Sequence, residues 1–253
     1  MCIDYIPNDA ISSVYEGMSS TEIVTLLKPQ QNLLNYRKIG KNSYVDLSTG
    51  ELKEYRKKTS DFDKNTWLKK SIAKLIRIID YNFAYDNSEL FITLTFRTMV
   101  TYQEARKTFV RFWERFNYHY KNCGYIMVIE PNANGKWHLH ILVKCFTGYI
   151  AVSQSEITSL WGHGYARVKR ISFRDFGKYF AKKEKLLRAD LYPPHVKLFT
   201  ASHDMVRPAV LKMSYEDALK LVEGMSLVRI SEKSIYSDDK CINIILYEKY
   251  RRK

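Results

Sequence analysis

The clearest hydrophobic pattern begins at residues 90–96, a short run of apolar and β-branched side chains that predicts a buried strand. Residues 105–120 then repeat apolar side chains at helical spacing. Thr101, with Glu104 three positions later, predicts a capping box at the start of this helix. Upstream, residues 66–83 predict an amphipathic helix that packs on the domain. The basic outer face of that helix suits either solvent or DNA.

A hairpin is predicted next. Residues 125–130 and 137–145 both have the composition of strands, and the turn-rich segment 131–135 separates them. The pattern continues with a short helix near 154–161, a strand near 165–171 and a basic helix near 173–188. This β-α-β-β-α-β-α order predicts an α+β fold: an antiparallel sheet of the split βαβ (ferredoxin-like or RRM-like) kind, with helices packed on one face.

The two ends of the sequence have weaker patterns than the middle. Residues 1–62 are more polar, and we interpret them as an N-terminal accessory region that includes a hairpin formed by 43–47 and 51–55. Residues 63–195 then form the core. Residues 196–253, with a helix near 215–225 that begins after Ser214 and β-like runs at 227–230 and 241–247, are expected to be a C-terminal extension of the same domain.

Composition and charge narrow the classes of function. With 253 residues and 45% hydrophobic side chains, the chain is long enough to bury a core in one domain or two small ones. Four cysteines without a CxxC pair argue against a disulfide framework and a zinc cluster. No apolar run reaches the length of a membrane span and the start of the chain does not resemble a signal peptide, so a cytoplasmic location is expected.

The formal net charge of +14 indicates a polyanionic partner, with nucleic acid ahead of an anionic membrane. Half of this excess is local, because nine Lys or Arg and only two acids lie between His163 and Arg188. A solvated helix face is the alternative interpretation of the basic cluster. We expect the cations of this region to contact DNA, namely Lys169, Arg170, Arg174, Lys178 and Lys183.

Two histidines carry the strongest chemical signal. His138 and His140 are two positions apart on a predicted strand, so both imidazoles project from the same face of the sheet. Glu130 ends the neighbouring strand and can bring a carboxylate to the same ion, although a plain acid beside the turn is the alternative. Two imidazoles and a carboxylate suit Mn²⁺ or Mg²⁺, which would act as a Lewis acid on a phosphoryl oxygen.

A tyrosine on the basic helix is the candidate nucleophile. Lys182 and Lys183 follow Tyr179 at offsets of three and four, which places all three on one side of that helix. A phenol is a weak nucleophile at neutral pH, and a nearby ammonium group and a metal-bound phosphate would favour the phenolate. Thr93 and Thr95 share one face of the first strand, where they either line the floor of the site or simply fill the strand.

These motifs together resemble the HUH superfamily of rolling-circle replication initiators, which are found on plasmids, mobile elements and phages. The similar segments are Phe91-Ile92-Thr93-Leu94-Thr95, Glu130 with Gly135-Lys136-Trp137-His138-Leu139-His140, Trp161-Gly162-His163-Gly164, and Tyr179-Phe180-Ala181-Lys182. The resemblance implies that His138 and His140 bind a divalent metal with Glu130 as a third ligand. It also implies that Tyr179 cleaves one DNA strand and stays attached as a 5′-phosphotyrosine, with Lys182 near the phosphate.

The expected function is therefore nicking of a single-stranded or hairpin origin to start rolling-circle replication. The chain has no phosphate-binding GxxxxGK[ST] loop, so a host helicase and polymerase are expected partners. Three alternatives remain: a relaxase or single-strand transposase of the same superfamily, a DNA-binding protein of this fold without catalysis, and a metal hydrolase that uses the two histidines.

Overall fold

A computed structural model describes residues 6–28, 36–40, 43–47, 49–54, 60–84, 86–132, 134–171, 192–193, 196–237 and 240–252. It confirms the α+β class, with antiparallel sheets packed by helices. The chain divides into two compact units. The first contains the described residues of Met1–Glu16, Ser20–Asp63 and Ala209–Lys253, and the second contains those of Gly17–Ser19 and Lys64–Pro208.

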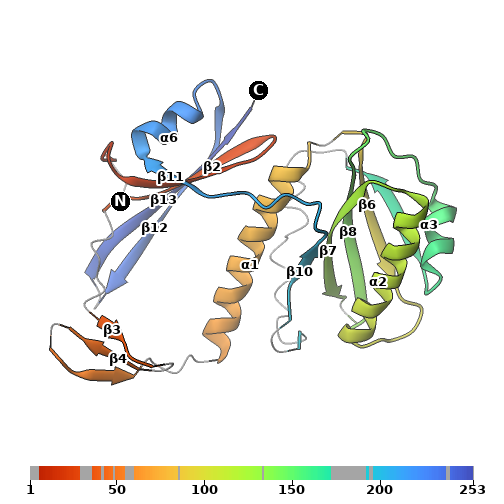
Figure 1. Cartoon of the computed structure of the whole chain (residues 1–253), viewed down its shortest axis with the longest axis horizontal. Coiled ribbons are helices and arrows are strands. Elements are labelled where there is room, and N and C mark those ends of the chain that lie inside the picture. The colour runs from red at the N-terminus through yellow and green to blue at the C-terminus, as the bar shows by residue number, and fades with distance from the viewer. Residues whose placement is uncertain are drawn as a thin grey trace. The chain divides into compact units, whose positions relative to one another are not determined.

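The second unit is built on a five-stranded antiparallel sheet in the order β10-β7-β8-β6-β9 (Figure 1). Its strands are β6 (Glu89–Thr95), β7 (Cys123–Pro131), β8 (Trp137–Cys145), β9 (Ala166–Arg170) and β10 (Phe199–Ala201). The predicted strand and hairpin of this region are confirmed. The turn between β7 and β8 is fixed by Asn132, whose Oδ1 accepts hydrogen bonds from the backbone of Asn134 and Lys136.

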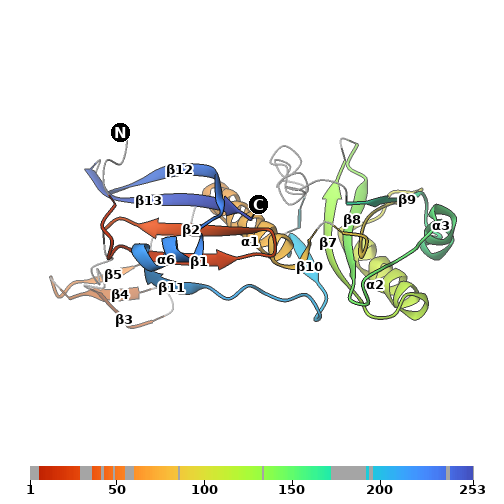
Figure 2. The ribbon, with the colours of Figure 1, turned by 90° about the horizontal axis from the view of Figure 1, so that it is seen from above.

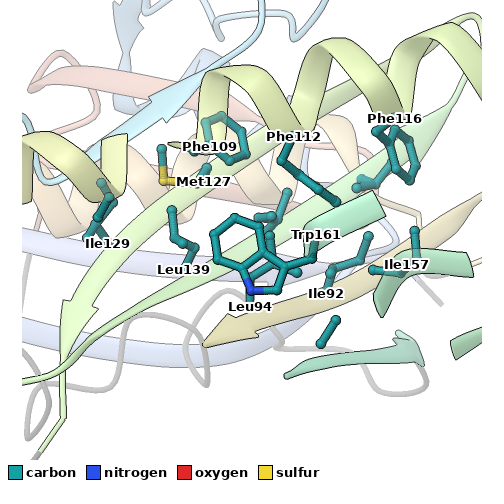
Figure 3. Close-up of a cluster of buried hydrophobic side chains, with 14 of the residues drawn as sticks. Ile92, Leu94, Phe109, Phe112, Phe116, Met127, Ile129, Leu139, Ile157 and Trp161 are labelled. Atoms are coloured by element: carbon teal, nitrogen blue, oxygen red, sulfur yellow. The ribbon is translucent and has the colours of Figure 1, made fainter. Parts of the chain in front are cut away.

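Helices α2 (Tyr102–His119) and α3 (Gln154–Trp161) cover one face of this sheet. The predicted capping box is present, since the Thr101 hydroxyl accepts from the Glu104 backbone and the Glu104 carboxylate accepts from the Thr101 backbone. Aromatic side chains of α2 and α3 pack on alternate residues of the strands, as Figure 3 shows. The most deeply buried include Ile92, Leu94, Phe112, Phe116, Leu139 and Trp161, each 0% exposed.

Helix α1 (Ser60–Asn82) packs on the opposite face of the sheet, so the expectation that helices lie on one face holds only for α2 and α3. Leu75, Ile78 and Ile79 of α1 contact Ile126 and Leu142 in a second hydrophobic cluster. The alternation of side chains in β7 and β8 explains the difference, because both strands carry apolar residues on both faces at this end of the sheet. Part of the second face is therefore covered.

The first unit contains another five-stranded antiparallel sheet, in the order β11-β1-β2-β13-β12 (Figure 2). Its strands are β1 (Ile11–Glu16), β2 (Ser20–Leu26), β11 (Leu211–Ser214), β12 (Ser226–Ser237) and β13 (Lys240–Arg251). Helix α6 (Tyr215–Leu221) begins after Ser214 as predicted, and Val14 and Ile23 of the sheet belong to the same hydrophobic cluster as Ala218 of the helix. A small sheet of β3 (Tyr36–Lys38), β4 (Ser43–Asp46) and β5 (Leu52–Glu54) contains the predicted hairpin.

This arrangement differs from the expected boundaries at 62/63 and 195/196. The C-terminal segment does not extend the core, because β11 pairs with β1 and β13 pairs with β2. The core unit runs instead to residue 208. Among the helices that the structure describes, none is long and apolar enough to cross a membrane.

Candidate metal centre on the sheet

The strand register brings the predicted metal ligands to one face of the core sheet. Glu130 of β7 lies directly opposite His138 of β8, and two residues further along β8 His140 lies opposite Thr93 of β6. Thr95 is the partner of His138 on the other side. Since directly opposed residues of antiparallel strands project from the same face, all five side chains share the face opposite α2 and α3.

His140 is held between two of these neighbours. Its Nδ1 lies 3.2 Å from Thr93 Oγ1, and its Nε2 lies 3.4 Å from Glu130 Oε2. The ring also stacks on Phe91, with ring centroids 5.6 Å apart and planes inclined by 20°. These contacts fix the orientation of the imidazole and direct Nε2 toward the carboxylate.

Glu130 is only 4% exposed, which is unusual for a carboxylate at the end of a strand. A buried carboxylate has to be balanced by hydrogen bonds, a positive charge or a metal ion. The environment of Glu130 therefore favours a ligand role over that of a plain acid beside the turn.

The donors fit a divalent ion in part. Two donors that each lie about 2.1 Å from one ion are separated by about 3.0 to 3.4 Å, and the distance between His140 Nε2 and Glu130 Oε2 lies in this range. His138 is close, with its ring centroid 6.4 Å from that of His140 and the planes inclined by 25°. Within the described part of the chain, no group of three His, Cys, Asp or Glu side chains is arranged to hold a metal ion.

Tyr192 is a neighbour of the site that the sequence analysis missed. Its hydroxyl donates to the Ile129 carbonyl at 2.9 Å, beside Glu130. Burial first, and then the negative charge of Glu130, raise the pKa of Tyr192, so the phenol stays protonated at neutral pH. Tyr192 is therefore a structural donor that fixes the end of β7. Nothing in the local sequence marks it, because its partner is 63 positions away.

The segment between α3 and β9 packs against the end of β6. Trp161 Nε1 donates to the Thr95 carbonyl at 2.9 Å, and the Thr95 backbone N–H donates to the Tyr165 carbonyl at 2.8 Å. Gly164 makes the closest approach, since a Cβ added there would lie 2.2 Å from the Thr95 carbonyl oxygen. The Trp-Gly-His-Gly segment thus positions the strand that carries both threonines.

The basic residues of β9 divide between the two faces of the sheet. Lys169 lies opposite Phe91, so it shares the face of the histidines, as a DNA contact requires. Arg170 lies opposite Leu90 on the other face, where its guanidinium donates to the carbonyls of Asn87 and Ile150. Arg170 therefore has a structural role that the sequence analysis did not foresee.

Arg167 was not predicted as a site residue. It lies opposite Thr93 and is exposed on the face of the histidines. The alternation of side chains in a strand was the signal that could have distinguished it from Arg170. Tyr179, Lys182, Lys178, Lys183 and Arg174 lie outside the described residues.

Comparison with protein families gives one result. Residues 89–185 match a family model of phage replication-associated proteins, the ORF2 family. The match begins at the first residue of β6 and includes every predicted metal ligand and Tyr179. It associates this part of the chain with DNA replication. Comparison with curated proteins and with solved structures gave no significant match.

Proposed function

We propose that this protein is a metal-dependent endonuclease and strand transferase that nicks single-stranded or hairpin origin DNA and starts rolling-circle replication. The observation that carries the proposal is the contact between His140 Nε2 and Glu130 Oε2, 3.4 Å apart on the open part of the sheet face, beside His138. The family match over residues 89–185 supports the same assignment.

In this proposal His140 and Glu130 hold Mn²⁺ or Mg²⁺, and His138 is the further ligand. The bound ion would supply Lewis acidity to the scissile phosphate. Thr93 has a supporting role, because its contact at Nδ1 keeps the imidazole oriented with Nε2 toward the ion. The buried position of Glu130 keeps the carboxylate in place with little loss of side-chain entropy on binding.

The reaction proposed for Tyr179 is a transesterification. Its phenolic oxygen forms a bond to the phosphorus while the bond from phosphorus to the 3′ oxygen of the preceding nucleotide breaks. The products are a 5′-phosphotyrosine and a free 3′-hydroxyl, to which the leaving oxygen takes a proton. Lys182 or Lys183 stabilises the charge that develops on the phosphate. A host helicase and polymerase would extend the free 3′ end.

The test is incubation of the full chain with candidate single-stranded origin DNA and Mn²⁺, followed by mass spectrometry of the DNA adduct. We expect an adduct on Tyr179. Tyr179→Phe should abolish nicking and retain DNA binding, because it removes one hydroxyl and no charge. A protein that binds the DNA but never nicks it would support the non-catalytic alternative. An adduct on another residue would contradict the assignment of Tyr179.

A further inference from the structure

The edge strand β9 presents a regular row of exposed side chains. Tyr165, Arg167 and Lys169 are all exposed, and Tyr165 retains 63% of its accessible surface. The residues between them point the other way: Ala166 is fully buried, and Val168 packs against the same hydrophobic cluster. The row therefore repeats every second residue, at intervals of about 6.8 Å along the strand.

The register connects this row to the candidate metal centre. Arg167 lies opposite Thr93, and on the other side of Thr93 lies His140. Lys169 lies opposite Phe91, whose ring stacks on His140. Tyr165 is joined to Thr95 by a backbone hydrogen bond and by a second one from the Thr95 hydroxyl to the same carbonyl. The row thus runs along the margin of the face that carries the metal ligands.

The chemistry of the row is that of a surface for single-stranded nucleic acid. An exposed phenol ring offers a stacking surface for one base, and two cations offer contacts to successive phosphates. No acid lies between His163 and Ile171, so nothing in this stretch opposes a polyanion. Arg170 contributes no contact of this kind, because its guanidinium is bound to two backbone carbonyls of the same unit.

We propose that Tyr165, Arg167 and Lys169 form a binding track for the DNA strand that crosses the metal centre. Tyr165 stacks on a base, and the two cations bind the phosphates that follow it. The choice of single-stranded DNA as the ligand rests on the proposed function. The track itself is a binding surface, and its loss can be measured without cleavage.

The experiment measures the binding of a labelled oligo-dT by fluorescence anisotropy over a range of salt concentrations, with the full chain. The double variant Arg167→Ala/Lys169→Ala is compared with Arg111→Ala/Arg115→Ala, which removes the same charge from exposed positions of α2 on the covered side of the sheet. We expect the β9 variant to lower the slope of log affinity against log salt by about 1.4, which corresponds to two lost phosphate contacts. The α2 variant should leave the slope unchanged.

The aromatic contact has its own matched pair. Tyr165→Ala should weaken binding by about fivefold or more, the effect of losing one stacked base. Tyr118→Ala, which changes a tyrosine that is 77% exposed at the end of α2, should have no effect. Tyr165→Phe should restore binding, because it keeps the ring. A bound oligonucleotide that carries 5-iodouracil should cross-link to Tyr165 under ultraviolet light.

Equal losses in the β9 and α2 double variants would overturn the proposal, since they would show a general effect of charge. So would an unaffected Tyr165→Ala variant, or a wild-type protein that does not bind oligo-dT. Nicking is assayed separately. If the wild type forms the Tyr179 adduct and the β9 variants bind DNA normally, only the track is wrong. If the β9 variants lose binding and no adduct forms, only the proposed function is wrong.

Discussion

The Nε2 atom of His140 lies 3.4 Å from the Oε2 atom of Glu130, on adjacent strands of the core sheet. Within the proposed function, both atoms bind the same ion. We expect His140→Ala and Glu130→Gln each to reduce nicking by about 100-fold or more, because several kcal/mol of charge stabilisation is lost and each 1.36 kcal/mol is a factor of ten. Gel assays of nicking at fixed Mn²⁺ provide the measurement. Nearly normal rates in either variant would contradict the ligand role.

Thr93→Val tests the support of the imidazole. The change preserves shape and removes the hydroxyl that lies 3.2 Å from His140 Nδ1. The concentration of Mn²⁺ that gives half-maximal nicking should rise by about 10-fold to 100-fold, the usual effect of losing an outer partner of a metal ligand. Thr95→Val is the control, because the Thr95 hydroxyl donates to a backbone carbonyl instead. A similar rise in both variants would argue against a specific role for Thr93.

Gly164→Ala tests the packing of the segment before β9 against β6. The added methyl group would lie 2.2 Å from the Thr95 carbonyl oxygen and 2.7 Å from the Arg97 nitrogen, and backbone atoms cannot yield as a flexible side chain does. We expect the free energy of unfolding to fall by about 3 kcal/mol or more. Gly135→Ala, where the methyl group meets open space, should cost about 1 kcal/mol from its positive φ alone. Denaturant titrations of both variants decide the point.

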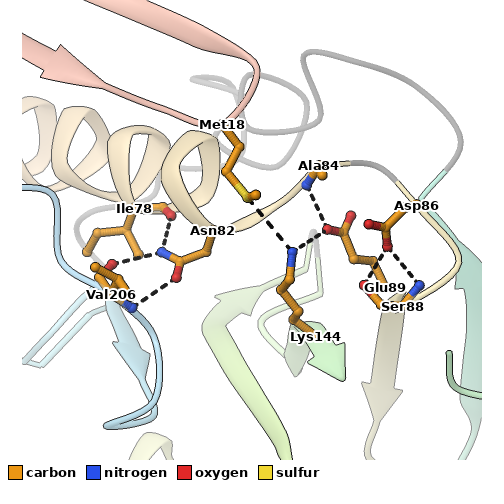
Figure 4. Close-up of polar contacts among 9 residues, drawn as sticks. All are labelled: Met18, Ile78, Asn82, Ala84, Asp86, Ser88, Glu89, Lys144 and Val206. Atoms are coloured by element: carbon orange, nitrogen blue, oxygen red, sulfur yellow. Dashed lines mark hydrogen bonds and ion pairs between the residues drawn. The ribbon is translucent and has the colours of Figure 1, made fainter. Parts of the chain in front are cut away.

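Lys144→Met tests the buried ion pair at the other end of the sheet (Figure 4). Lys144 Nζ lies 3.2 Å from Glu89 Oε1, and Glu89 also accepts a hydrogen bond from the Ala84 backbone. Removal of the ammonium next to a carboxylate that is 0% exposed should cost about 3 kcal/mol of unfolding free energy. Adding Glu89→Gln should restore part of the loss, since the amide oxygen still accepts from Ala84. A double variant no more stable than Lys144→Met would contradict this account.

Asp86 gives the pH dependence of the same region a definite sign. Burial raises its pKa, but hydrogen bonds from the Ser88 side chain and backbone and the charge of Lys144 lower it further, so the pKa lies below its ordinary value of 3.8. The folded state therefore favours the ionised form. Its contribution to stability is present above about pH 4 and is lost as the pH falls through the folded-state pKa. Unfolding free energies measured through this acid range should fall less steeply in Asp86→Asn than in the wild type, and equal slopes would contradict the prediction.

The sequence predicted the core unit well because its signals are local. The capping box of Thr101 and Glu104 is contained in four residues, and the pairing of β7 with β8 follows from one short turn. Alternation along β8 placed His138 and His140 on one face before any tertiary contact was known. These features depend on neighbours in the chain, which the sequence shows directly.

The features that the sequence analysis missed depend on residues far apart. β1 and β2 were not predicted, and their partners β11 and β13 come from the other end of the chain. The role of Arg170 depends on carbonyls of Asn87 and Ile150, and that of Tyr192 on the carbonyl of Ile129. No periodicity encodes such contacts, because the register of two distant strands is fixed only when both are packed.

The pairing of β2 with β13 also sets an order of events during synthesis. The Lys28 backbone N–H donates to Asn243, 215 positions later, so the sheet of the first unit has a central strand whose neighbour is among the last residues to leave the ribosome. The second unit, whose strands all lie between residues 89 and 201, has no such requirement. We expect the nicking unit to fold on the nascent chain, while the strands made first wait for those made last.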